Sequence, residues 1–273
     1  MIRVELSKML RRPLTWVTIA ALNALPTLVA VLLALTDLGP RPGTGPPFLS
    51  AVLTDGTLFP LAALGIVLPL FLPVAVAVVG GDAIAGEVQS DTLRYLLVRP
   101  VSRLRLLVAK MVSVITFVFL ATLIVALVAY VEGKLLLGRA PPTPGGAVVS
   151  VSGSTLTQTQ MFERSAMAFV YVVLAMLGVA AIALMLSTMT DSAVAAALGT
   201  IGFLVASTVL LGLDAAEALK PYLVTRYWLA FIDLFRDPIR WRDVTHGVLA
   251  QLAYLVVFAG AAWANFATRD VNR

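Results

Sequence analysis

The residues that could do chemistry are concentrated in one stretch, Gly80 to Lys110, with the sequence GGDAIAGEVQSDTLRYLLVRPVSRLRLLVAK. This stretch places carboxylates beside a run of arginines and separates two long apolar runs. Such groups form charge-assisted hydrogen bonds with a partner of complementary charge. A segment this polar has to lie outside a bilayer when its neighbours cross one. We therefore interpret it as a docking surface exposed to water.

The rest of the chain is poor in the groups that catalysis requires. It has no cysteine, which excludes disulfides and thiolate chemistry, and its one histidine, His246, stands near Asp243, where an interfacial role is the more frequent one. No HExxH or GxSxG motif occurs, and Asp82 after Gly80 and Gly81 has no second aspartate inside an apolar run with which to form an acid pair. We expect no catalytic residue and no metal site, and we do not expect the chain to be an enzyme by itself.

The composition is that of an all-α integral membrane protein forming a single transmembrane domain over residues 1–273. Hydrophobic residues make up 60% of the chain and charged residues 13%, and the mean hydropathy is +0.95. A membrane-spanning helix needs about 20 apolar residues. Six runs without Asp, Glu, Lys or Arg have this length, and they predict spans at 14–35, 58–79, 111–131, 166–188, 193–213 and 248–267.

The distribution of Lys and Arg predicts the orientation. Six spans place both termini on one side, and that side carries eleven of the 20 cations, in residues 1–12, 80–110 and the tail, against nine opposite. The five cations of residues 214–246 are balanced by five acids. We expect cytoplasmic termini and a multi-pass protein of the inner (plasma) membrane of a prokaryote.

The segments around the spans have distinct characters. Residues 1–12 predict a basic amphipathic helix in contact with membrane lipid headgroups, unless their charges serve only as a topology signal. Within 132–165, alternating residues around Ser152-Gly153-Ser154 predict a small β-hairpin. The aromatic and charged residues of 214–246 predict an external loop of short helices at the membrane surface, with a pore-lining re-entrant element as the alternative.

The polar residues inside the predicted spans are uncharged, with Ser, Thr, Asn and Gln side chains. Ion-coupled carriers usually hold an acidic residue or a broken helix near the middle of the membrane, and the predicted spans contain no acid, so ion coupling has no support in them. Prolines in the second span predict a kink that could open a path. The residues that we expect to line a translocation path are Asn23, Pro69, Pro73, Thr200 and Gln251.

The polar stretch resembles a pattern found in ABC-2 type transporter permeases. In that family a Glu is followed by Gly-Thr-Leu, a Leu pair, Pro-Val-Ser-Arg and a Lys at the start of the third span. This chain has Glu87, Asp91-Thr92-Leu93, Leu96-Leu97, Pro100-Val101-Ser102-Arg103 and Lys110, and it ends with Trp263, Phe266 and Arg269-Asp270-Val271, similar to the family's finish. Asp91 stands where the family usually has Gly.

The resemblance implies an ABC-2 type exporter fold in which 80–110 is a cytoplasmic coupling elbow of helix, break and helix. It also implies a dimer, with two identical permease chains as the expected composition, and two separate ATP-binding subunits that hold ATP and Mg. This chain has no GxxxxGK[ST] loop, so the energy would come from that partner. The docking residues would be Glu87, Asp91, Thr92, Arg94, Arg99 and Arg103.

Other functions stay open at this point. The elbow could hold a cytoplasmic partner without transport, as in a membrane anchor or sensor, or the chain could be an ATP-independent carrier or channel. We expect no cofactor in this chain and no nucleic-acid partner. The cargo cannot be deduced from the sequence, although an apolar path with mild polar groups favours lipophilic molecules over free ions.

Overall fold

The computed structural model describes the whole chain except residues 37–47, 54, 91–101, 138–147, 150–154 and 269–273. Within the described part, six helices are long and apolar enough to cross a membrane. They are α2 (Pro13–Thr36), α4 (Phe71–Gln89), α6 (Arg103–Leu136), α7 (Gln158–Met189), α8 (Ala193–Gly212) and α9 (Trp241–Thr268). The prediction of a helical multi-pass membrane protein with six spans is therefore confirmed.

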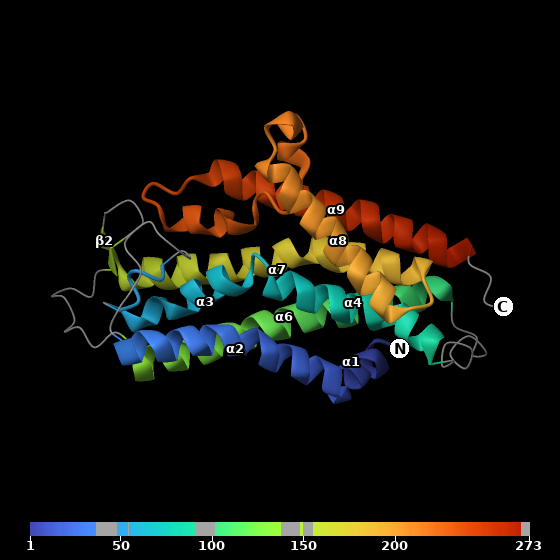
Figure 1. Cartoon of the computed structure of the whole chain (residues 1–273), viewed down its shortest axis with the longest axis horizontal. Helices are drawn as coiled ribbons and strands as arrows, with labels where there is room; N and C mark the ends of the chain where they lie inside the picture. The colour runs from blue at the N-terminus through green and yellow to red at the C-terminus, as the bar shows by residue number, and fades with distance from the viewer. Residues whose placement is uncertain (37–47, 54, 91–101, 138–147, 150–154, 269–273) are drawn as a thin grey trace.

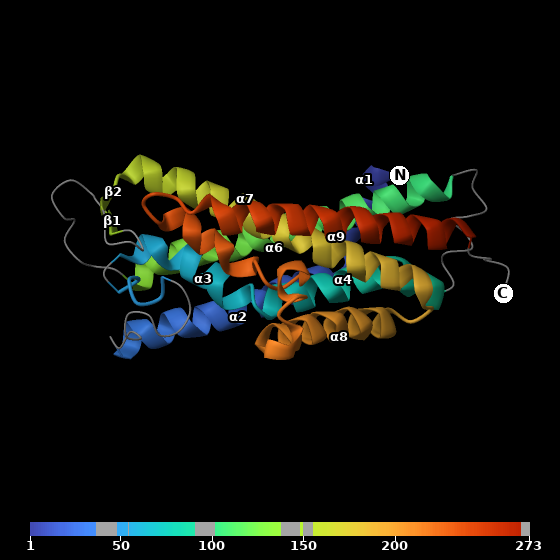
Figure 2. The ribbon, with the colours of Figure 1, turned by 90° about the horizontal axis from the view of Figure 1, so that it is seen from above.

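The long helices run side by side in one elongated bundle (Figures 1 and 2). The short helix α1 (Ile2–Arg11) and the C-terminal end of α9 lie at the same end of the bundle, which we call the terminal end. A two-stranded hairpin of β1 (Val148–Val149) and β2 (Thr155–Leu156) lies at the opposite end, the hairpin end. The predicted hairpin is therefore present.

The second predicted span is broken in the middle. A short 3-10 helix, η1 (Gly56–Leu58), leads into α3 (Phe59–Val67), and α4 begins only at Phe71. Pro69 lies in the break, where its missing N–H removes a helical hydrogen bond. Pro73 lies in the first turn of α4, where an N–H would have no partner within the helix. The predicted kink is thus a complete interruption.

The polar stretch is helical at both ends, as the predicted elbow of helix, break and helix requires. α4 continues ten residues past the predicted end of its span at Val79, and α6 begins at Arg103 with the Ser102 side chain accepting a hydrogen bond from the Arg105 N–H. Between these helices, residues 91–101 lie outside the described residues. We call residues 90–102 the connecting segment.

Close packing fixes α4 between α7 and α8. A Cβ atom on Gly81 would lie 2.8 Å from the backbone nitrogen of Ala197, so only glycine allows this approach. On the other side, the Ser187 hydroxyl of α7 donates to the Gly81 carbonyl at 2.7 Å. Small residues and hydroxyls at such crossings are typical of helix packing in membranes. The polar end of α4 is therefore held in a defined position.

Residues 213–240 contain short helices, as their composition predicts. The three are 3-10 helices, η2 (Asp214–Ala216), η3 (Lys220–Tyr222) and η4 (Trp228–Phe235), and we call residues 213–240 the inserted segment. The Gln251 amide of α9 donates to the Val224 carbonyl at 2.8 Å. Because Gln251 lies ten residues into α9, or about 15 Å along its axis, the inserted segment lies beside the first half of α9.

Three further hydroxyls hold the backbone of the inserted segment. Tyr171 of α7 donates to the Tyr227 carbonyl at 2.6 Å, and Tyr254 of α9 donates to the Tyr222 carbonyl at 2.9 Å. Ser207 of α8 bonds to the Thr225 hydroxyl at 2.9 Å. Non-helical backbone at membrane depth needs such partners because no water is present there.

Candidate functional site

The described residues contain a cluster of six charged side chains at the terminal end. Three are acids and three are bases, and they come from α1, α4 and the first turns of α6. We call this set the charge cluster. Its members are Glu5, Lys8, Arg12, Asp82, Glu87 and Lys110.

The chain turns sharply at Arg12, which sets the position of α1 against the bundle. Arg12 has an extended backbone, as expected for a residue that precedes proline, and Pro13 begins α2. The turn leaves the last carbonyls of α1 without helical partners. The Thr15 hydroxyl donates to the Met9 carbonyl at 2.7 Å, and the Trp16 indole donates to the Leu10 carbonyl at 2.8 Å.

The cations of α1 divide between two directions. Lys8 and Arg12 face acids of α4, whereas Arg3 and Arg11 are exposed. The side of α1 that is buried on the bundle is centred on Glu5 and Met9. The prediction that all four cations serve lipid headgroups or topology is therefore wrong for two of them.

Lys110 of α6 is the centre of the charge cluster. Its Nζ atom lies 2.7 Å from Glu5 Oε2 and also forms an ion pair with Glu87. Lys8 forms a second ion pair with Glu87. The three residues Glu5, Glu87 and Lys110 are 4%, 0% and 4% exposed. A buried charge with several partners is tolerated, but removing one partner leaves the others uncompensated.

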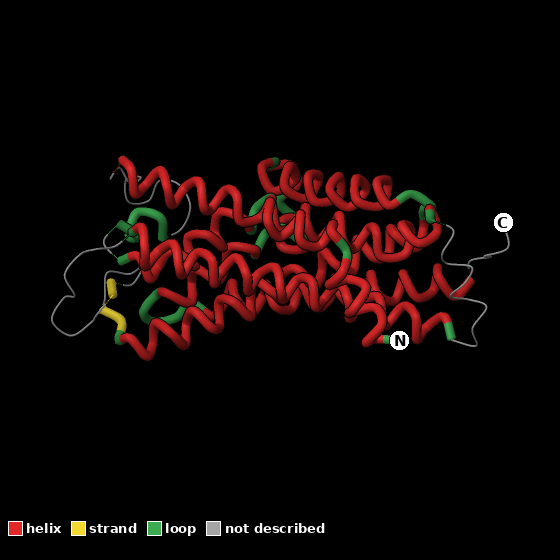
Figure 3. The backbone as a smooth tube through the Cα atoms, turned by 90° about the horizontal axis from the view of Figure 1, so that it is seen from below, coloured by secondary structure: helices red, strands yellow, loops and turns green. Residues whose placement is uncertain are grey.

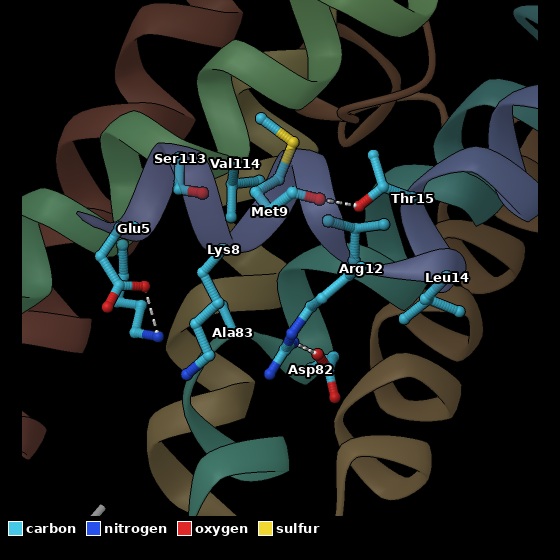
Figure 4. A pocket seen from close by; sticks show the side chains of 12 residues that line it. Glu5, Lys8, Met9, Arg12, Leu14, Thr15, Asp82, Ala83, Ser113 and Val114 are labelled. Carbon is cyan, nitrogen blue, oxygen red and sulfur yellow. Dashed lines mark hydrogen bonds and ion pairs between the residues drawn. The ribbon is translucent and has the colours of Figure 1, made fainter. Parts of the chain in front are cut away.

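Arg12 and Asp82 form a more open ion pair next to this centre, visible in Figure 4. Beside them is a small hollow of about 40 Å³, lined by residues of α1, α4 and α6. A hollow of this size accommodates a water molecule or two, since one water needs about 10–15 Å³ on the same measure. It is too small for an organic cargo. In this conformation the charge cluster is a structural connection and not a binding pocket.

The charge cluster joins both ends of the connecting segment to α1. Glu87 lies three residues before Ser90, where the segment begins, and Lys110 lies two turns after Ser102, where it ends. Nearby, Arg103 donates to the carbonyls of Phe266 and Ala267 at 3.2 and 3.0 Å, which ties the start of α6 to the end of α9. Figure 2 shows α1, the start of α6 and the end of α9 together at the terminal end, and Figure 3 shows the bundle from below. Movement of the connecting segment would therefore be transmitted directly to α1, α6 and α9.

The structure places the predicted docking residues in different situations. Glu87 is fully buried inside the protein, so a direct contact with a partner, as predicted, requires this network to open. Its role here is to position α4 against α1 and α6. Arg103 is half-buried on the end of α9. The others, Asp91, Thr92, Arg94 and Arg99, lie outside the described residues.

The predicted path residues are not brought together. Asn23 and Thr200 bond to carbonyls of their own helices, at 2.7 Å to Ile19 and 2.9 Å to Ala196. Gln251 holds the inserted segment instead of facing a path. Pro69 is exposed in the break, and Pro73 is buried. None of the five lines the described hollow.

The ion pairs of Lys110 with Glu5 and of Arg12 with Asp82 were not predicted from the sequence. The contact between Lys8 and Glu87 joins residues 79 positions apart, which no helical spacing reveals. One available signal was the position of Asp82 and Glu87 directly after an apolar run. Acids this close to apolar runs generally need a partner.

The fold defines a multi-pass helical membrane protein whose N-terminal helix is held by buried ion pairs. The chain matches the model of a family of proteins of unknown function, DUF2705, over residues 44–272, and it belongs to that family. The match begins after α2, so that α1 lies outside it. No curated protein matches the chain.

Proposed function

We propose that this chain is the transmembrane permease subunit of an ABC-type exporter, which works as a dimer and is driven by two copies of a separate ATP-binding subunit. The observation that carries this proposal is the charge cluster, which links both ends of the connecting segment to α1. The resemblance of residues 87–110 to ABC-2 type permeases supports the same function.

The connecting segment is suited to receive a mechanical input. It is the part of the chain where the predicted docking residues Asp91, Thr92, Arg94 and Arg99 are found. Glu87 and Lys110 bind each other, so α4 and α6 are coupled at the ends of this segment. A force on the segment would move both helices together rather than bend one of them.

The mechanism follows from this coupling. When ATP-binding subunits close, they would push the connecting segments of two permease chains, and α4 and α6 would follow. Because Lys8 and Glu5 join α1 to the same two helices, α1 and the first span would move as well. Switching needs two arrangements of such a packed unit. The break between α3 and α4 at Pro69 is where α4 could turn without moving α3.

The proposal is tested by purifying the tagged full-length chain from its native membranes and identifying the proteins that remain bound. We expect an ATPase that contains a GxxxxGK[ST] loop, in equal amounts with the chain. Arg99→Glu and Arg103→Glu should each reduce ATPase binding or uncouple hydrolysis from transport while membrane insertion is kept. Lys134→Glu, which reverses an exposed charge near the hairpin end of α6, is the control.

Other outcomes would support other functions. If no ATPase binds, the chain does not work as proposed, and a partner without a phosphate-binding loop would indicate a membrane anchor or sensor. Solute flux into liposomes that contain the chain alone would indicate an ATP-independent carrier or channel. Charge-reversed variants that bind the ATPase and transport normally would show that the connecting segment is not the docking site.

A further inference from the structure

A half-buried acid lies near the hairpin end, far from the charge cluster. Glu132 of α6 follows the predicted third span by one residue, and the structure includes it in the helix. The Thr27 hydroxyl of α2 donates to Glu132 Oε1 at 2.6 Å. The other carboxylate oxygen, Oε2, is buried and has no hydrogen-bond partner among the described residues.

The position of Thr27 shows how deep this acid lies. Thr27 is fourteen residues after Pro13 and nine before Thr36, so it lies about 21 Å and about 13 Å from the two ends of α2. The α2 helix is a span, and Glu132 therefore contacts it well inside both ends. An acid at such a depth is expensive to keep and usually marks a functional site.

The neighbouring charges do not neutralise Glu132. Lys134 is nearest in sequence, but its Nζ atom lies over the ring of Tyr130, 4.7 Å from the centroid. Asp55, next to the contact between Gly56 and Gly133, is an acid, and it accepts hydrogen bonds from Thr57. No salt bridge to Glu132 is found in the described part of the chain.

The backbone around Glu132 is held rigidly. A Cβ atom on Gly133 would lie 2.1 Å from the Gly56 carbonyl oxygen, so α6 and η1 are in direct backbone contact one residue away. Glu132 and Thr27 are both half-buried, which leaves one side of the pair open at the surface of the bundle. The backbone beside the carboxylate is therefore fixed, and the carboxylate is reachable from the surface where α2 and α6 meet after a small side-chain movement.

The ligand that would satisfy this carboxylate carries one positive charge and hydrogen-bond donors. A bound metal ion of the hard type requires six or more oxygen ligands, and no group of three or more metal-binding side chains occurs in the described chain. A protonated amine needs only about three acceptors. Glu132 Oε2 and the Thr27 oxygen provide two, and the Asn23 amide lies one turn from Thr27 on the same side of α2.

We propose that Glu132 and Thr27 form a binding site for the protonated amine of an amphiphilic molecule, reached from the surface of the bundle where α2 and α6 meet. The amine would be held by the Glu132 carboxylate and the Thr27 hydroxyl, and its apolar part would lie along the exposed apolar residues of α2. This site is independent of the proposed function, because it lies at the end of the bundle away from the connecting segment.

The test uses a dansyl-labelled pentylamine and the full-length chain in nanodiscs of phosphatidylcholine. We expect saturable binding of the amine, seen as increased fluorescence, and at least about tenfold weaker binding of the matched N-acetylated probe, which has no charge. Glu132→Gln should weaken amine binding by about tenfold or more, and Thr27→Val by about threefold. Glu163→Gln, which removes an exposed acid at the same end, should leave it unchanged.

Two further competition experiments identify the source of the protonated amine. If phosphatidylethanolamine in the nanodisc competes with the probe, the amine is that of a lipid headgroup, and if only dissolved amines compete, it is that of a soluble amphiphile. Displacement by sodium at tens of millimolar would overturn the proposal in favour of a metal ion. Equal binding of the two probes to the native protein would also overturn it, and this comparison needs no variant that might fail to fold.

Discussion

The charge cluster and the inserted segment hold parts of the chain on the bundle by different chemistry. At the terminal end, α1 is fixed by ion pairs in which Lys110 contacts Glu5 and Glu87. Beside α9, the inserted segment is fixed mainly by neutral groups, with the Gln251 amide and the Tyr171 and Tyr254 hydroxyls donating to backbone carbonyls. Near the end of the segment, Arg164 of α7 adds one ion pair to Asp237 at 3.8 Å. Both regions hold a segment of the chain on the bundle, but they use different kinds of polar contact.

The difference follows from the position of each region along the bundle. Near the end of the bundle a charge can be stabilised partly by water and headgroups, whereas in the middle of a span an unpaired charge costs several kcal/mol or more. Neutral amides and hydroxyls carry a smaller desolvation penalty and still satisfy the carbonyls. Ion pairs therefore suit a connection at the membrane edge, and neutral donors suit one at depth.

The largest effect is expected for Lys110→Met, which leaves Glu5 and Glu87 buried without their common partner. The free energy of unfolding should fall by about 3–5 kcal/mol, as for other broken buried pairs. Thermal unfolding in detergent micelles measures the loss. Lys134→Met, which removes an exposed lysine near the other end of the same helix, is the control and should lose about 1 kcal/mol or less. A small loss in Lys110→Met would show that the ion pairs do not hold α1.

The second prediction concerns Gly81, where α4 of the charge cluster meets α8, the helix that leads into the inserted segment. Gly81→Leu places a side chain against the backbone of Ala197 and should cost about 1–3 kcal/mol by overpacking. Gly202→Ala in α8 is the matched control, because no atom lies within 4 Å of the added Cβ, and it should keep or slightly raise the melting temperature. Equal melting temperatures for both variants would contradict the close contact.

The third prediction tests the neutral region. Gln251→Leu leaves the Val224 carbonyl without its donor and should weaken the hold on the inserted segment by about 1–3 kcal/mol. Because the chain has no cysteine, Thr225→Cys introduces the only thiol, and its reaction with a water-soluble maleimide should become faster in the Gln251→Leu background. Gln89→Leu, at the terminal end, should not change the rate. An unchanged rate in both the Gln251→Leu and the Gln89→Leu variant would mean that the inserted segment is held by its apolar contacts alone.

The smallest effect is expected for Arg12 and Asp82, whose side chains are 34% and 22% exposed. A double-mutant cycle with Arg12→Gln and Asp82→Asn should give a coupling energy of about 0.5–1 kcal/mol that decreases with added salt. A coupling as large as the loss in Lys110→Met would show that the charge cluster acts as one unit. The difference between the central and the outer pair would then disappear.

The apolar runs were sufficient to predict the six spans, because a length of apolar residues is a local property of the sequence. The break at Pro69 was also within reach, since proline acts on its own helix. The ends of α4 and α6 could not be predicted from the apolar runs, because both helices continue into charged residues. Glu87 and Lys110 stay helical because they pair with each other, and that pairing depends on how the chain folds back on itself.

The position of Glu132 was also beyond what the apolar runs could predict. It stands one residue past the predicted third span, and a rule based on apolar runs places it outside the membrane. In the structure it contacts Thr27, a residue 105 positions away in the middle of another span. The depth of a side chain depends on the stagger between helices, and the sequence of one helix does not contain that information.

The length of α6 has a geometric consequence. It is one uninterrupted helix of 34 residues, from Arg103 to Leu136, with Lys110 near one end and Glu132 near the other. These two residues are separated by about 33 Å of helix. If α6 tilts as a rigid rod about its Lys110 end, a rotation of about 5° moves Glu132 sideways by about 3 Å, which is the length of a hydrogen bond. A slight change of angle at the terminal end is then enough to separate Glu132 from Thr27.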